Sequence, residues 1–177
     1  MKRVVFYTGI VLFSILIILN SCKKDTSSGS FNTELLTNGE WQLTGLTVNP
    51  AFSYSGFLSI SNLYKYLDSC QTDIFFIFNT LNDDSTIIQN EGTTKCNASV
   101  SQTEVIGTWS LNSKKNVLII NDTTASFEII NVLGSLNLFN GYMNIIALTA
   151  STLQTTVVEE ANTNVKYTFT LTFKNKN

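Results

Sequence analysis

The C-terminal stretch Val165–Lys174, VKYTFTLTFK, has the clearest pattern in the chain and decides the fold class. Val, Tyr, Phe, Leu and Phe alternate with Lys or Thr along it. A period of two is typical of a β-strand that has one buried and one solvent-exposed face. The stretch therefore predicts a half-buried strand in an antiparallel sheet.

The same kind of pattern continues through most of the chain. There is one proline, and β-branched and aromatic residues recur in short runs, which favours strands. Because most connections are short, neighbouring strands should pair antiparallel. Eight or nine such strands predict an all-β fold, an up-and-down meander barrel, with a two-sheet sandwich as the alternative. The expected strands are Trp41–Val48, Thr72–Asn79, Thr86–Glu91, Gly107–Asn112, Val117–Asn121, Ser126–Val132, Tyr142–Leu148, Leu153–Val158 and Val165–Phe173.

Residues 49–69 interrupt this pattern. The segment is rich in aromatic residues, and Ser61 could cap a short helix over residues 61–68. A connection of this length that is this apolar should fold over one end of the barrel or along its wall. It is either a lid for a ligand, with the barrel mouth near residues 52–67, or a structural plug.

The N-terminus has the organisation of an export signal. Two cations in Met1–Arg3 precede an apolar run from Val4 to Leu19, and Leu19–Cys22 reads LNSC. This resembles a bacterial lipoprotein signal peptide with its lipobox, which implies cleavage before Cys22 and acylation of that cysteine. The apolar run is shorter than the roughly 20 residues of a spanning helix, so a retained signal anchor is the weaker interpretation.

The domain organisation follows from this leader. Residues 1–21 are the expected signal peptide, residues 22–35 a flexible tether, and residues 36–177 one barrel domain. The resemblance places the protein in the bacterial cell envelope, attached to a membrane by lipid and most simply to the outer membrane, with the membrane face left open.

Composition excludes several classes of function. The chain contains no histidine, and Arg3, in the leader, is its only arginine. A net charge of −2 without a basic face argues against nucleic-acid binding. Histidine-based triads and histidine zinc sites are impossible. The pair Asp83-Asp84 is better explained as a turn than as a catalytic carboxylate pair, so we expect no enzyme, no metal and no cofactor.

Two cysteines remain after Cys22, and in an exported protein they predict a disulfide between Cys70 and Cys96. The midpoint of the two positions is Asp83, the expected turn of a hairpin. The same register would place Phe76 opposite Asn90 and Phe78 opposite Ile88.

A set of motifs in fixed order suggests a family. The chain contains Gly39-Glu40-Trp41, then Cys70-Gln71-Thr72-Asp73 before an aromatic strand, then Cys96 and Gly107-Thr108-Trp109. This order resembles the lipocalin-like lipoproteins of Bacteroidetes-type bacteria, over about residues 36–175. The resemblance implies a small lipocalin-like (calycin-like) barrel. The chain departs from the family in lacking an arginine to pair with the first tryptophan, so no activity is carried over.

The expected function is a non-enzymatic binding module for a small apolar or amphipathic ligand or a glycan. The alternative is a barrel filled by its own side chains that binds proteins, as an envelope enzyme inhibitor or an accessory subunit of an outer-membrane complex. An eight-stranded barrel has room for either arrangement. The candidate ligand-binding residues are Trp41, Phe57, Tyr64, Tyr66, Phe76, Trp109 and Tyr167.

Overall fold

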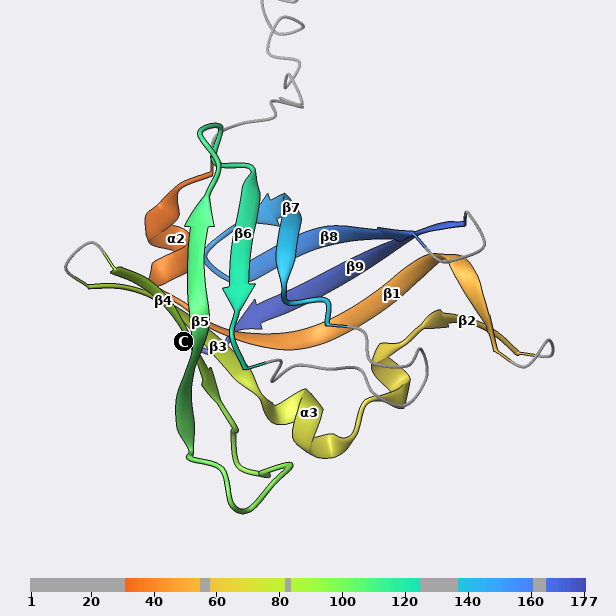
Figure 1. Ribbon diagram of the computed structural model, residues 1–177, viewed down its shortest axis with the longest axis horizontal. Coiled ribbons are helices and arrows are strands. Elements are labelled where there is room, and N and C mark those ends of the chain that lie inside the picture. Colours follow the sequence, from red (N-terminus) through yellow and green to blue (C-terminus); the bar gives the residue numbers. More distant parts are fainter. Residues whose placement is uncertain (1–30, 55–57, 82–83, 125–136, 161–164) are drawn as a thin grey trace, which may run out of the picture.

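The computed structural model describes residues 31–54, 58–81, 84–124, 137–160 and 165–177. These residues form a closed antiparallel barrel of eight strands with one extra strand, connected as an up-and-down meander (Figure 1). The predicted fold class is thereby confirmed, and the two-sheet sandwich is wrong. The strands are β1 (Glu40–Tyr54), β2 (Leu58–Asn62), β3 (Phe75–Leu81), β4 (Asp84–Asn90), β5 (Thr103–Leu111), β6 (Val117–Asp122), β7 (Gly141–Leu148), β8 (Thr152–Glu160) and β9 (Lys166–Asn175).

Strand β1 closes the barrel. Its first residues, Glu40–Gln42, pair with β3, and residues Trp41–Asn49 pair with β9 on the other side. Beyond that point its second half pairs with the extra strand β2. In Figure 1, β8, β9 and β1 run side by side across the view, and β2 follows at their far end.

The expected long loop over residues 49–69 is largely wrong. Strand β1 continues to Tyr54, and β2 returns along it with Phe52 opposite Ile60. Pro50 is tolerated because the register shifts between Thr47 and Phe52, where no regular ladder is required.

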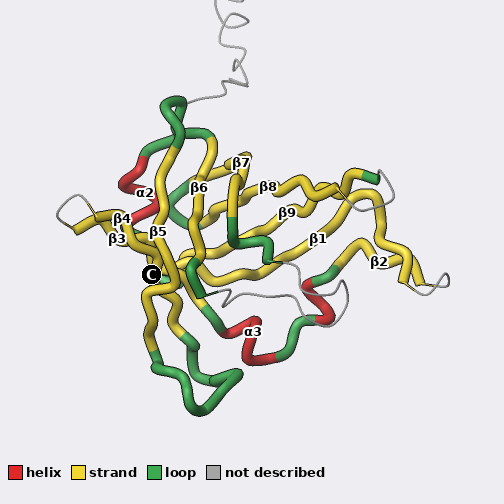
Figure 2. Tube along the Cα trace, in the orientation of Figure 1, coloured by secondary structure: helices red, strands yellow, loops and turns green. Residues whose placement is uncertain are grey.

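Helical turns follow β2, but not where they were expected. Ser61 lies within β2 and caps no helix. A single turn of 3-10 helix, η2 (Tyr64–Tyr66), comes next, and then α3 (Ser69–Asp73), where a strand was expected from Thr72 (Figure 2). A capping box formed by the N-cap Asp68 and by Gln71 starts α3, so Thr72 and Asp73 are helical and not extended.

Folded structure begins before residue 36. Helix α2 (Thr33–Thr37) starts at its N-cap Asn32, Leu36 is fully buried, and Phe31 packs against the core. The prediction of a tether up to residue 35 is therefore wrong at its C-terminal end, because these apolar side chains gain from burial against the barrel. None of the described helices is long and apolar enough to cross a membrane. Cys22 and the predicted signal peptide lie outside the described residues.

The hairpin of β3 and β4 has a register one residue away from the predicted one. Phe76 lies opposite Gln89 and Phe78 opposite Ile87. A shift of one residue exchanges the two faces of a strand, so Ile87 and Gln89 point inward in place of their neighbours. The predicted turn at Asp83 and the predicted strand Ser126–Val132 lie outside the described residues.

Candidate functional site: the barrel interior

Three of the proposed ligand-binding residues belong to the core. Trp41 and Phe76 are completely buried, and Trp109 is nearly so. The indole N–H of Trp41 donates to the carbonyl oxygen of Leu36 at 2.8 Å, which ties helix α2 to the barrel. The indole N–H of Trp109 donates to the carbonyl oxygen of Asn79 at 3.2 Å. Both indole N–H groups therefore already have a hydrogen-bond acceptor within the protein.

The other candidates lie elsewhere. Tyr64 is half-buried in η2, whereas Tyr66 is exposed. Tyr167 at the start of β9 is half-buried and contacts Phe52, with 5.7 Å between the ring centroids. Phe57 lies outside the described residues. The structure thus separates the described candidates into core residues and residues near β2 and η2, and does not gather them in one pocket.

An aromatic stack fills the middle of the barrel. The ring of Phe139, from the turn before β7, stacks on Phe76 with 4.2 Å between centroids. Phe173 meets Phe139 edge-on at 5.8 Å and Phe76 at 6.3 Å. Edge-on and stacked contacts of this kind add to the stability gained from burial. Phe139 was not among the sequence candidates; it lies outside every predicted strand and outside the aromatic segment 49–69.

The gap that remains beside this stack has no room for a water molecule. In the described part of the chain the interior at this level is thus filled by the protein's own side chains. All but one of the residues around the gap are apolar. They are Trp41, Phe76, Phe78, Leu118, Phe139, Met143, Leu153, Thr155 and Phe173.

Two buried polar atoms in the described residues have no hydrogen-bond partner: the hydroxyl oxygen of Thr155 and the side-chain carbonyl oxygen of Gln89. Thr155 is fully buried at an inward position of β8, between Leu153 and Val157. Most buried polar groups in proteins are paired, so such exceptions need an explanation. Sequence reasoning missed Thr155, because threonine is common in strands and nothing local distinguishes this one from its neighbours.

The orientation of the Gln89 amide is set by a neighbouring carboxylate. Gln89 Nε2 donates to Oε1 of the buried Glu91 at 2.7 Å. The other carboxylate oxygen accepts from the backbone N–H of Cys96 at 3.4 Å. Because the amide nitrogen of Gln89 donates to Glu91, the carbonyl oxygen of the same amide is left over.

Polar contacts hold the turn that carries Phe139. The backbone N–H of Phe139 donates to Asn137 Oδ1 at 2.9 Å. Asn137 Nδ2 in turn donates to the buried Asp122 carboxylate at 3.1 Å. The backbone N–H of Asp122 donates to Asn140 Oδ1 at 3.3 Å. We call Asp122, Asn137 and Asn140 the clasp; it fixes the turn to the end of β6.

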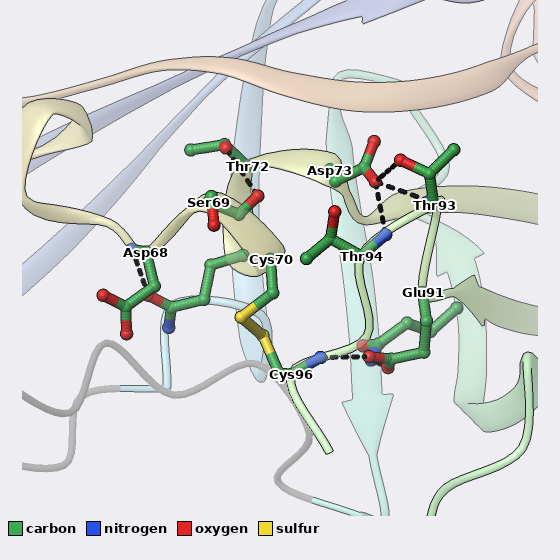
Figure 3. The surroundings of a disulfide bond; sticks show 11 residues. Asp68, Ser69, Cys70, Thr72, Asp73, Glu91, Thr93, Thr94 and Cys96 are labelled. Atoms are coloured by element: carbon green, nitrogen blue, oxygen red, sulfur yellow. Dashed lines mark hydrogen bonds between the residues drawn. A yellow bond between two sulfur atoms is a disulfide. The ribbon is translucent and has the colours of Figure 1, made fainter. Parts of the chain in front are cut away.

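A disulfide and a buttressed carboxylate join α3 to the loop after β4 (Figure 3). Cys70 and Cys96 are bonded, as predicted, with 5.1 Å between their Cα atoms. Beside them, Asp73 accepts from the Thr93 hydroxyl at 2.6 Å and from the Thr94 N–H at 2.8 Å. The bridge lies outside the β3–β4 ladder, so the pairing holds although the register used to infer it was shifted.

The same contacts make Asp73 sensitive to pH. The Thr93 hydroxyl, followed by the Thr94 N–H, holds the pKa of Asp73 below its ordinary value of 3.8. A lowered folded-state pKa contributes stability above the unfolded-state value, and that stability is lost as the pH falls through the folded-state pKa. We expect Asp73→Asn to lower the free energy of unfolding by about 1 kcal/mol near pH 6, since the site is exposed, and by less below about pH 4.

Urea unfolding of both proteins across this pH range measures the difference. Glu104→Gln removes an exposed carboxylate from β5 and is the control. A difference between wild type and Asp73→Asn that does not change with pH would show that the charge on Asp73 is irrelevant to stability.

The described residues contain no group of three or more His, Cys, Asp or Glu side chains able to hold a metal ion. No protein-family model matches the chain, and a search of the curated proteins finds no match either. The candidate site is therefore defined by geometry alone: an apolar interior with an aromatic stack and two unpartnered polar atoms.

Proposed function

We propose that this protein is a non-enzymatic binding module, lipocalin-like and anchored to the bacterial cell envelope by lipid on Cys22, whose barrel takes a small apolar or amphipathic ligand. The observation that carries the proposal is the unpartnered hydroxyl of Thr155, which faces the gap; the unpartnered carbonyl oxygen of Gln89 belongs to the residue opposite Phe76. Apolar pockets with a few well-placed polar groups are typical of ligand sites. The closed eight-stranded meander supports the lipocalin-like assignment.

The residues around the gap favour an apolar or amphipathic ligand over a glycan. A glycan needs many hydrogen-bond partners, and the residues around the gap offer only the hydroxyl of Thr155. An apolar or amphipathic molecule with one or two polar groups fits this surface better. Because the gap has no free room, such a ligand enters it only if a side chain moves aside.

A second candidate function rests on the outside of the barrel. Tyr142 and Ile146 on β7 and Val158 on β8 are exposed by 72%, 52% and 53%. Tyr142 lies opposite Ile119 of β6. We call the outward residues in the middle of these three strands the neutral face; it is formed by Val117, Ile119, Asn121, Tyr142, Asn144, Ile146, Gln154, Thr156 and Val158.

The neutral face as defined carries no charged side chain, and the exposed Glu160 borders it at the end of β8. Loss of charged residues and enrichment in tyrosine are features of the centres of protein interfaces. The face therefore favours the alternative function, in which the filled barrel binds an envelope protein through β6, β7 and β8.

One pair of variants separates the two functions. Thr155→Val changes a hydroxyl to a methyl group inside the barrel, and Tyr142→Lys places a charge on the neutral face. We expect native mass spectrometry of wild-type protein, purified from its own membranes, to show a bound small molecule that Tyr142→Lys keeps and Thr155→Val largely loses.

Stability provides a second measurement. In ligand-free protein, Thr155→Val should leave the free energy of unfolding unchanged or raise it by up to about 1 kcal/mol, because it removes an unsatisfied buried hydroxyl. If no molecule co-purifies and no apolar dye binds, the ligand-binding function is wrong. Loss of a specific cross-linked protein in Tyr142→Lys, but not in Thr155→Val, would then establish the interaction function.

A further inference from the structure

We infer that Phe139 is a built-in plug: its ring occupies the position of the ligand, and the ligand is a small planar aromatic molecule that carries hydrogen-bond donors. This inference rests on the proposed ligand-binding function and adds to it the chemical class of the ligand and the way in which access is controlled. It is carried by the placement of Phe139, the character of its neighbours and the clasp that holds its turn.

Phe139 is the one residue around the gap that does not belong to a strand. Each of the others lies on a strand that is hydrogen-bonded into the closed barrel. Moving one of those side chains out would break ladder hydrogen bonds. Moving Phe139 leaves the ladder intact, although residues 137–140 have to give up the contacts of the clasp and the ring contacts of Phe139.

The contacts of Phe139 define the shape that replaces it. Its ring is stacked on Phe76 and meets Phe173 edge-on. A planar aromatic molecule in the same place would regain both ring contacts, whereas an aliphatic chain would regain neither geometry. Replacing the Phe139 ring by the ligand thus loses few packing contacts if the ring of the ligand is flat and of similar size.

The unpartnered atoms define the polar groups of the ligand. Thr155 faces the same gap as Phe139, and Gln89 lies opposite Phe76, on which Phe139 stacks. A carbonyl oxygen only accepts hydrogen bonds, and a hydroxyl can accept as well as donate. A phenylalanine ring satisfies neither atom, whereas a phenol or an indole supplies the missing O–H or N–H donor.

The clasp sets how readily the plug leaves. A protein that has to open before it binds shows an apparent affinity reduced by the fraction of molecules that are open. Asn137 links the N–H of Phe139 to the carboxylate of Asp122, so removing its side chain should raise the open fraction. We expect Asn137→Ala to bind phenol roughly tenfold more tightly than wild type, as the loss of one or two hydrogen bonds implies.

The test uses the full-length disulfide-bonded protein with phenol, indole and benzene as probes. Benzene has the ring but no donor. Calorimetry measures the affinities, and NMR of the labelled Phe139 ring, identified by its absence in Phe139→Leu, reports whether the plug moves. Thr155→Val should reduce the preference for phenol over benzene, and Asn144→Ala on the neutral face should change nothing.

The outcomes are distinct. Phenol binding with a shifted Phe139 signal, strengthened by Asn137→Ala, supports the plug. Phenol binding with an unmoved Phe139 and no effect of Asn137→Ala overturns the plug and leaves the binding function standing. No binding of any probe to wild type, Asn137→Ala or Phe139→Leu overturns both. Phe139→Leu keeps an apolar side chain at this position, so the test does not depend on a variant with an emptied core.

Discussion

Replacement of Trp41 by alanine is expected to lower the free energy of unfolding by about 3–5 kcal/mol, the usual range for a buried large aromatic residue. Trp41 is completely buried and lines the central gap together with Phe76. Its indole N–H also holds helix α2 through Leu36. The variant therefore loses core packing and the attachment of the N-terminal helix in one step.

Trp41→Phe separates these two contributions. It keeps an aromatic ring but leaves the Leu36 carbonyl oxygen without its donor, and we expect a smaller loss than for alanine. Tyr142→Ala, which removes an aromatic side chain exposed by 72%, is the control and should change stability by less than about 0.5 kcal/mol. Urea unfolding followed by circular dichroism measures all three. Equal losses for Trp41→Ala and Tyr142→Ala would contradict the burial on which this expectation depends.

Removal of the disulfide is expected to cost about 3–4 kcal/mol. The two cysteines are 26 positions apart in the sequence. A disulfide that closes a loop of this length stabilises the folded protein by about that free energy, because it restricts the conformations of the unfolded chain. It also ties α3 to the loop after β4, which the hydrogen bonds of Asp73 join as well. The double variant Cys70→Ser/Cys96→Ser should thus unfold at lower urea concentration and show faster hydrogen exchange in residues 91–100.

The reduced wild-type protein provides the matched comparison. Reductant should lower the unfolding midpoint of wild type toward that of the double variant and leave the double variant unchanged. If reductant does not move the wild-type unfolding midpoint, the disulfide contributes little to the free energy of unfolding. The exposed position of Cys96 would then affect that contribution more than the length of the loop that the disulfide closes.

Strand-forming segments could be predicted from the sequence because alternation is a local signal. The inward row of β9, Phe169, Leu171 and Phe173, is buried as its pattern indicates. Closure of the barrel was the favoured prediction, because it removes both sheet edges, but the pattern of strands was also compatible with a two-sheet sandwich. The disulfide was correct although the register was shifted by one, because the two cysteines lie beyond the ladder.

The site was harder to predict, because aromatic residue type does not reveal whether a ring fills the core or lines a pocket. Trp41, Phe76 and Trp109 were sensible candidates, and all three are core residues. Phe139 and Thr155 carry the candidate site, and neither stands out locally: one lies in a turn, and the other is a common residue in strands. Their role comes from which strands meet inside the barrel, which a single sequence does not specify.

The ladder between β1 and β9 joins the first strand to the last. Even the final residues contribute, since the backbone N–H of Lys176 donates to the carbonyl oxygen of Glu40 at 2.9 Å. Before β9 has folded against them, β1 and β8 each have an edge with unpaired backbone groups, and these edges can bind neighbouring chains. Loss of β9 would thus expose two sheet edges at once, which favours aggregation of an otherwise folded barrel.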